Sequence, residues 1–232
     1  MNARETEVIV ALDTDSLGAE EELLKQLRLH IRRYKVGLRL FTASGRRAIE
    51  LIRRYDGDVF LDIKLHDIPQ TVAHAVQEAQ KLGVFAVSLH LCGGLDMLRA
   101  AADVHPRPKL WGVTVLTSLS EEDVKALHPR LSLHPLSARL AELGKHAGLD
   151  GTICSGREVP LLKETLGPDA CFICPGIRPS GHEAHDQKRL ITPADAARLG
   201  VRYAVIGRPI TRAENPKKAA QDILAEIHNA NR

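Results

Sequence analysis

The sequence is poor in aromatic residues, in net charge and in long apolar runs, and each shortage excludes a class of function. Aromatic side chains make up 3% of the 232 residues, which leaves few rings on which nucleic-acid bases could stack. The formal net charge is only +3 and no dense basic run accompanies it, so nucleic-acid binding has little support. No apolar stretch reaches the roughly 18 residues that a membrane-spanning helix needs. The polar residues 1–7 predict no signal peptide, and we therefore expect a cytoplasmic protein that binds neither membranes nor nucleic acid.

Cysteine is also scarce, and its spacing does not favour a disulfide. The four cysteines are Cys92, Cys154, Cys171 and Cys174. Cys171 and Cys174 have the spacing of a redox pair, but they fall in an expected strand, where residues three apart point to opposite faces. We therefore expect four reduced thiols. His-x-His and Glu-x-x-His spacings are missing as well, so the sequence predicts no metal site.

Short β-branched or apolar runs alternate with amphipathic segments along the chain, with no linker between them. The expected strands are residues 8–12, 34–36, 59–64, 86–90, 110–116, 151–154, 171–174 and 203–206. The expected helices are residues 19–30, 43–55, 71–82, 95–103, 137–146, 158–166, 193–199 and 216–229. This alternation predicts an α/β fold, a (β/α)8 TIM barrel that forms one domain over residues 1–232. A doubly wound open sheet is the alternative.

Two of the expected connections are longer than the others. One spans residues 117–136 and contains a short expected helix at 121–127, and the other spans residues 175–192. Both follow strands, so in a barrel they lie on the carboxyl face, where barrel enzymes carry their chemistry. The second connection is a candidate lid.

Three charged residues stand close together at the end of the third expected strand. Asp62 and Lys64 are two residues apart and so project from the same face of a strand, and Asp67 follows on the turn before a helix that begins near Pro69. Each charge alone is consistent with a surface ion pair or a helix-start aspartate. Their shared place at a strand's carboxyl end favours a site that moves a proton.

Further charges are expected at the same mouth, because a barrel brings the ends of successive strands together. Asp13 follows the first strand and Lys35 lies on the second, which completes a ring of alternating charge with Asp62 and Lys64. Such a ring would hold Lys64 protonated and rigidly aimed.

The other end of the chain supplies candidate anion-binding groups. Gly207 and Arg208 follow the eighth strand, where barrel enzymes commonly bind phosphate, although a turn glycine beside a surface arginine is the simpler interpretation. Arg178 and Gln187 lie on the connection after the seventh strand and could reach the same ligand. His90, at the end of the fourth strand, is interpreted as a barrel residue and not as a metal ligand.

Taken together, these segments resemble the orotidine 5′-monophosphate decarboxylase family. The Asp-x-Lys-x-x-Asp run of residues 62–67 alone would indicate only a wider group that includes sugar-phosphate decarboxylases. Pro-Gly-Ile-Arg-Pro at 175–179 and Gly-Arg-Pro-Ile-Thr at 207–211 are more specific. The chain departs from the family pattern at Cys174, where a threonine is expected, and at Leu91 and Cys92, where smaller residues are usual. The matching segments are residues 11–13, 35–37, 60–71, 114–118, 175–179, 186–189 and 207–211.

The resemblance implies decarboxylation of orotidine 5′-monophosphate to uridine 5′-monophosphate and CO2, the last step of de novo UMP synthesis, without a cofactor or a metal. It implies that Lys64 protonates C6 as CO2 leaves and that Asp62 faces the substrate carboxylate. Lys35 would join Asp13, which binds the ribose, to this pair.

The resemblance also implies a homodimer with shared sites, because Asp67, Ile68 and Thr71 would enter the neighbouring subunit's site. Thr117 or the adjacent Ser118 would meet the pyrimidine amide edge. The remaining substrate-binding residues implied by the resemblance are Pro175, Arg178, Gln187, Gly207 and Arg208.

Two other functions remain open from the sequence. A 3-keto-gulonate 6-phosphate decarboxylase or a hexulose-phosphate synthase would share Asp62, Lys64 and Asp67 but would use Mg²⁺ to stabilise an enediolate. A non-catalytic nucleotide-binding barrel would keep Gly207 and Arg208 without needing both Asp62 and Lys64.

Overall fold

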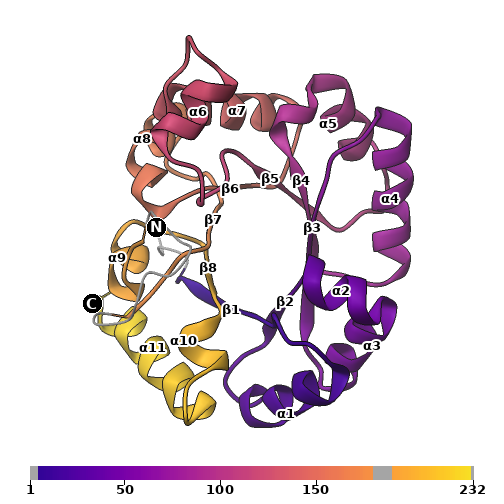
Figure 1. Ribbon diagram of the computed structural model, residues 1–232, viewed down its shortest axis with the longest axis vertical. Helices are drawn as coiled ribbons and strands as arrows, with labels where there is room; N and C mark the ends of the chain where they lie inside the picture. The colour runs from indigo at the N-terminus through magenta and orange to yellow at the C-terminus, as the bar shows by residue number, and fades with distance from the viewer. Residues whose placement is uncertain (1–4, 180–189, 231–232) are drawn as a thin grey trace.

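Parallel strands in chain order close into a barrel, and the helices form a ring around it (Figure 1). The computed structural model describes residues 5–179 and 190–230. Closure is made by β1 and β8, which pair in register from Glu7 with Tyr203 to Val10 with Ile206. The (β/α)8 prediction is therefore confirmed and the open-sheet alternative is wrong. The strands are β1 Glu7–Ala11, β2 Arg33–Gly37, β3 Asp58–Leu65, β4 Ala86–His90, β5 Lys109–Val113, β6 Gly151–Ile153, β7 Phe172–Cys174 and β8 Tyr203–Ile206.

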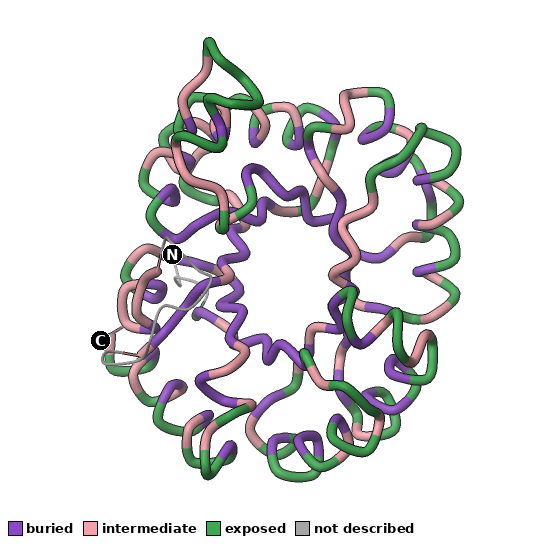
Figure 2. The backbone as a smooth tube through the Cα atoms, in the orientation of Figure 1, coloured by how far each residue is buried: buried purple, intermediate pink, exposed green. Residues whose placement is uncertain are grey.

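The helices bury one face against the barrel and expose the other, as the alternation of purple and green along the outer ring in Figure 2 shows. Several begin at side-chain caps: the Ser16 hydroxyl accepts from the Ala19 N–H, and Ser120 and Thr192 form capping boxes. The α-helices are α1 Leu17–Leu27, α2 Leu38–Ser44, α3 Arg46–Arg54, α4 Pro69–Lys81, α5 Leu95–Ala102, α6 Glu121–Leu127, α7 Leu133–His146, α8 Val159–Leu166, α9 Pro193–Arg198, α10 Arg208–Thr211 and α11 Pro216–Ala230, and two short 3₁₀ helices are η1 Leu91–Gly93 and η2 Gly156–Glu158.

The helix expected over residues 43–55 and the end of the fifth strand differ from the sequence prediction. The single helix expected over residues 43–55 is two helices, α2 and α3, because Gly45 adopts a φ of +57° that interrupts the helix. The fifth strand ends at Val113 and not at residue 116. Val115 instead packs with Val124 and Leu133 in a small separate cluster, so the apolar character of this stretch stabilises the long β5–α7 connection.

Half of the eight aromatic residues, Phe60, Phe85, Trp111 and Tyr203, belong to the cluster inside the barrel. Trp111 lies with its ring centroid 4.6 Å from that of Phe60 and 5.0 Å from that of Tyr203. The Arg33 guanidinium lies over the Phe85 ring, 4.7 Å from its centroid, at the amino-terminal end of the barrel. This aromatic packing fills the amino-terminal end of the barrel and leaves its carboxyl end open to solvent.

The structure places none of the four cysteines in a disulfide: Cys92 is exposed, Cys171 is partly buried, and Cys154 and Cys174 are buried. In the described part of the chain, no helix is both long enough and apolar enough to cross a membrane.

Glu20 on α1 gives the fold an unusual pH dependence. Its side chain is fully buried, and within residues 5–179 and 190–230 neither carboxylate oxygen has a hydrogen-bond partner. Burial therefore raises the pKa of Glu20 from 4.5 to about 8. Because the folded state holds this proton more tightly than the unfolded state, the free energy of unfolding should fall as the pH rises from 4.5 towards about 8.

Glu20→Gln should therefore raise the melting temperature at about pH 8 and change it little at about pH 5, because glutamine has no proton to lose. Thermal unfolding measured by circular dichroism at both pH values checks this. Glu164→Gln, at an exposed position of α8, is the matched control and should leave both temperatures unchanged. An equal effect of Glu20→Gln at the two pH values would contradict a buried, titrating carboxyl.

Candidate active site

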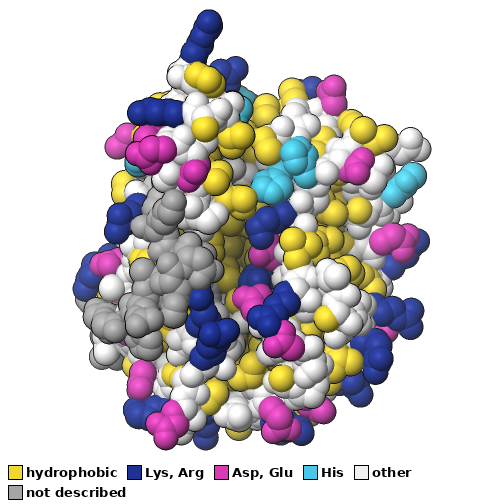
Figure 3. Space-filling view, viewed as in Figure 1, with side chains coloured by type: hydrophobic (Ala, Val, Ile, Leu, Met, Phe, Trp, Pro, Cys, Tyr) yellow, Lys and Arg dark blue, Asp and Glu magenta, His cyan; other side chains and the backbone are white. Residues whose placement is uncertain are grey.

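The carboxyl ends of the strands surround a pocket of about 520 Å³. The space-filling view shows it as a central hollow with an apolar floor and with basic and acidic side chains at its rim (Figure 3). The floor is made by inward-facing strand residues, which the period-2 alternation of each strand points into the barrel. They are Ala11, Phe60, Val113, Ile153, Ile173 and Val205.

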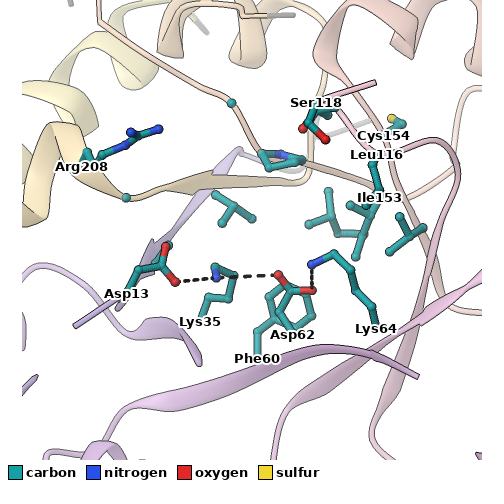
Figure 4. Close-up of a pocket in the computed structure, with 18 of the residues that line it drawn as sticks. Asp13, Lys35, Phe60, Asp62, Lys64, Leu116, Ser118, Ile153, Cys154 and Arg208 are labelled. Carbon is teal, nitrogen blue, oxygen red and sulfur yellow. Dashed lines mark hydrogen bonds and ion pairs between the residues drawn. The ribbon is translucent and has the colours of Figure 1, made fainter. Parts of the chain in front are cut away.

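A row of four alternating charges crosses one side of this pocket (Figure 4). Lys35 Nζ donates to Asp13 Oδ1 at 3.1 Å and lies 3.7 Å from Asp62 Oδ2. Lys64 Nζ donates to the other oxygen, Asp62 Oδ1, at 2.9 Å. The convergence of Asp13, Lys35, Asp62 and Lys64 that the sequence predicts is therefore present in the structure.

The inner part of the row is largely removed from water. The side chains of Lys35 and Asp62 are 12% and 13% exposed, compared with 53% for Asp13 at the outer end. Burial by itself would raise the pKa of Asp62. The charges of Lys35 and Lys64 and the hydrogen bonds from Lys64 and Ser88 outweigh it, so that the pKa of Asp62 is lowered. Asp62 is therefore an anion at neutral pH, held against the ammonium group of Lys64.

A glycine makes room for the outer ion pair. A Cβ atom at Gly37 would lie 2.7 Å from Lys35 Nζ and 3.2 Å from Asp13 Oδ1. Any larger residue at the end of β2 would displace the lysine from the carboxylate.

The backbone around Lys64 differs from the regular strand that the sequence predicts. Lys64 has a φ of +51°, and the pairing of β3 with β4 changes register between Leu61 and Leu65. The simple alternation of Asp62 and Lys64 is therefore interrupted. Ser88 on β4 contacts both residues: the Lys64 N–H donates to Ser88 Oγ at 2.9 Å, and the Ser88 hydroxyl donates to Asp62 Oδ1 at 2.8 Å.

The candidate phosphate-binding residues lie at the same mouth. In Figure 4, Arg208 is towards the Asp13 end of the charge row, and Leu116 and Ser118 are towards the Lys64 end. Arg178 is buried, and its Nη1 donates to the Ile177 carbonyl at 2.9 Å. The predicted site residues that line the pocket are Asp13, Lys35, Asp62, Lys64, Thr117, Ser118, Pro175, Arg178, Gly207 and Arg208. Gln187, and with it much of the candidate lid, lies outside the described residues.

Asp67, Ile68 and Thr71 are separate from this group. All three are exposed around the start of α4, and none is among the described residues that line the pocket. Asp67 Oδ1 accepts the Ile68 N–H at 2.6 Å, while the Ile68 side chain is 65% exposed. These three residues therefore do not contribute to the described part of the chain's own pocket.

Several residues at the site were not predicted from the sequence. Arg39 lines the pocket, forms an ion pair with Asp15 and donates to the Asp13 carbonyl at 3.5 Å. The floor residues could have been predicted from the period-2 alternation of each strand, which shows which side chains point into the barrel. Ser88 was harder to predict, because the only indication in the sequence is a single hydroxyl residue within an apolar strand. The other unpredicted lining residues are Val115, Leu116, Cys154, Gly176, Thr211 and Arg212.

The histidines at the mouth do not form part of a cluster with ligand spacing. The His66 and His90 rings are 5.5 Å apart, and burial, followed by the charges of His66 and Lys64, lowers the pKa of His90. Across residues 5–179 and 190–230, no group of three or more His, Cys, Asp or Glu side chains is arranged to hold a metal ion.

Comparisons with known proteins identify the family of this chain. The chain is 44% identical over 234 residues to an orotidine 5′-phosphate decarboxylase of Saccharophagus degradans. That alignment covers 99% of this chain and 98% of the relative. It is 42% identical to the enzyme of that name from Geotalea daltonii, with 95% of each chain covered. The crystal structure of orotidine 5′-phosphate decarboxylase from Lactobacillus acidophilus superposes with a TM-score of 0.84 at 35% identity, covering 96% of this chain and 99% of that one. Residues 6–223 match the family model described as orotidine 5′-phosphate decarboxylase / HUMPS. The chain therefore belongs to the orotidine 5′-phosphate decarboxylase / HUMPS family.

Proposed function

We propose that the protein decarboxylates orotidine 5′-monophosphate to uridine 5′-monophosphate and CO2, in pyrimidine biosynthesis. The observation that carries this proposal is the partly buried Asp62–Lys64 pair, which places an ammonium group and a carboxylate 2.9 Å apart beside an apolar floor. The names of relatives that match over nearly the whole chain favour this reaction over the sugar-phosphate reactions of the same family.

The pocket has suitable groups for each part of a pyrimidine nucleotide. The half-exposed Asp13 and its partner Lys35 are proposed to bind the ribose hydroxyls. Gly207 and Arg208 are proposed to bind the phosphate, assisted by Arg178, because guanidinium groups and backbone N–H groups suit a dianion. Thr117 and Ser118 would meet the amide edge of the base above the apolar floor.

The chemical difficulty is the carbanion that forms at C6 when CO2 leaves, because no ring orbital delocalises it well. A fixed ammonium group stabilises such a charge without reorganisation of solvent. Lys64 is proposed to supply this charge and then the proton, and Asp62 to hold Lys64 beside the substrate carboxylate. No step of this mechanism is assigned to a metal or an organic cofactor.

We further propose that the active form is a homodimer that shares its sites. Asp67, Ile68 and Thr71 are exposed and lie outside the chain's own pocket, and an isoleucine that is 65% exposed suits a surface that a second copy covers. In this arrangement Asp67 extends the charge row of the partner's site. We also propose that one barrel domain carries the whole activity. Because the structure places none of the cysteines in a disulfide, we propose that the protein works in the cytoplasm.

The proposed reaction is tested by adding the purified protein to orotidine 5′-monophosphate and following the ultraviolet spectrum as the carboxylate is lost. We expect complete conversion that is unaffected by a chelator. An unchanged spectrum with a folded protein would contradict the proposal, and turnover of a keto-sugar phosphate that stops with chelator would support the Mg²⁺-dependent alternative.

Arg208→Ala should raise the KM for orotidine 5′-monophosphate about 10- to 150-fold, because a charge-assisted hydrogen bond typically contributes about 1.5–3 kcal/mol. Soluble guanidinium should restore part of the lost activity, since the group that is missing is the cation that pairs with the substrate phosphate. Steady-state kinetics with and without guanidinium check this.

Orotidine without its phosphate is the control substrate, because it lacks the group that Arg208 is proposed to bind. Wild type and Arg208→Ala should process it equally poorly. Arg198→Ala, at an exposed position paired only with Asp195 in the described structure, should behave as wild type. If Arg208→Ala impairs the truncated substrate as severely as the full one, Arg208 does not act through the phosphate.

A further inference from the structure

Ser88 is a polar residue at the centre of β4 that no step of the proposed mechanism uses. It is fully buried and, like Ala86, faces the barrel interior, since Val87 and Leu89 pack outward against the helices. It is not among the described residues that line the pocket. A buried hydroxyl is normally retained only where its hydrogen bonds are satisfied, so its partners indicate what it does.

Both partners of Ser88 belong to the reactive pair, and both lie at an irregularity of β3. Leu65 is four positions after Leu61 on β3, whereas its partner Leu89 on β4 is only two positions after Val87, the partner of Leu61. The extra residues form a bulge, in which a backbone N–H loses its regular carbonyl partner on the next strand. The Lys64 N–H donates instead to Ser88 Oγ, at 2.9 Å.

The hydrogen bond from the Lys64 N–H to Ser88 is made by a residue in an unfavourable backbone conformation. Lys64 has a φ of +51°, in the left-handed region that residues with a Cβ atom rarely adopt. The conformation persists only where neighbouring groups fix it. In the described structure the Ser88 hydroxyl is the side chain that binds the amide of this residue.

The hydrogen bonds around Ser88 form a closed ring with a fixed direction. Because Ser88 Oγ accepts from the Lys64 backbone, its own proton is free to be donated, and it is donated to Asp62 Oδ1 at 2.8 Å. The same carboxylate oxygen accepts from Lys64 Nζ at 2.9 Å. The Lys64 ammonium group is thus bound directly to Asp62 Oδ1, and the Lys64 backbone N–H is connected to the same oxygen through the Ser88 hydroxyl.

We propose that Ser88 is a positioning residue for the decarboxylation: through this ring it sets the backbone of Lys64 and the orientation of Asp62, and thereby the place of the ammonium group beside C6. Ser88 itself does not contact the substrate. The proposal rests on the proposed function, because it concerns the placement of a group that acts only in the chemical step.

Ser88→Ala tests the proposal by removing both hydrogen bonds while leaving the side-chain volume nearly unchanged. We expect kcat for orotidine 5′-monophosphate to fall about 10- to 100-fold, the effect of a small misplacement of a reacting group. KM and the affinity for the product uridine 5′-monophosphate should stay within about twofold, because the ribose, phosphate and base contacts are unchanged.

Ser88→Thr and Ser88→Cys distinguish positioning from packing. Threonine retains the hydroxyl and should recover most of kcat, whereas cysteine fills a similar volume with a weak hydrogen-bonding group and should resemble alanine. Ser137→Ala is the matched control, because Ser137 on α7 is also a fully buried serine but has no hydrogen-bond partner among the described residues. It should leave kcat unchanged.

A kcat for Ser88→Ala or Ser88→Cys within about twofold of wild type would overturn the proposal, as would a loss of affinity for uridine 5′-monophosphate equal to the loss of kcat. Circular dichroism establishes that each variant is folded, and if Ser88→Ala is not, Ser88→Cys decides. The two hypotheses fail in different ways. Wild-type protein that binds uridine 5′-monophosphate but does not decarboxylate the substrate would refute the proposed function. An active wild type with an equally active Ser88→Ala variant would refute only the role of Ser88.

Discussion

Lys64→Ala is expected to lower kcat for orotidine 5′-monophosphate by about 10⁴-fold or more while the barrel stays folded. The substitution removes a fixed cation next to the developing carbanion and also the proton donor, and each of these roles is typically responsible for about 10²–10⁴-fold in rate. Single-turnover or long-incubation assays of product formation measure the residual rate, and a thermal melt establishes that the variant is folded.

The control for this variant is Lys25→Ala on α1, which removes an exposed lysine that is paired with Glu22 far from the pocket. Its kcat should equal that of wild type. A folded Lys64→Ala variant with near-normal turnover would remove Lys64 from the mechanism, and with it the chemical role of the Asp62–Lys64 pair.

Mixed dimers of Asp67→Ala and Lys64→Ala are expected to regain activity that neither variant has alone. If Asp67 acts in the partner's site, each heterodimer holds one site with both substitutions and one with neither. A heterodimer should then have about half the activity of the wild-type dimer, because isologous symmetry places the two intact residues in the same site. Activity is measured after the subunits are exchanged under mild denaturant and the heterodimer is purified by two different affinity tags.

Mixtures of each variant with itself are the controls and should stay inactive after the same treatment. Verified heterodimers without activity would show that Asp67 does not act across an interface. In that case its exposure at the start of α4 would need another explanation.

The fold and the principal charged residues were accessible from the sequence because they follow from periodicity. Period-2 runs and helical segments alternate along the whole chain, and parallel strands bring their carboxyl ends to one mouth whatever the details of each strand. For this reason Asp13, Lys35, Asp62 and Lys64 could be predicted to meet, although they are separated by up to 51 positions in the sequence.

The geometry within the site was less accessible, because it depends on departures from periodicity. The β3 bulge and the positive φ of Lys64 occur where the Lys64 N–H donates to Ser88 on the neighbouring strand β4, and no local pattern around residue 64 indicates them. The early end of β5 has a similar cause, since Val115 joins a small cluster with the β5–α7 connection. In both places a contact between distant segments overrides the local preference.

The most direct test of the proposed reaction is decarboxylation by the purified wild-type protein in D₂O, followed by nuclear magnetic resonance after treatment with a chelator. We expect orotidine 5′-monophosphate to be converted completely to uridine 5′-monophosphate that carries deuterium at C6, with an equal amount of CO2. Unchanged substrate in the presence of folded protein, or conversion only after Mg²⁺ is restored, would contradict a metal-independent decarboxylation in which an exchangeable proton reaches C6.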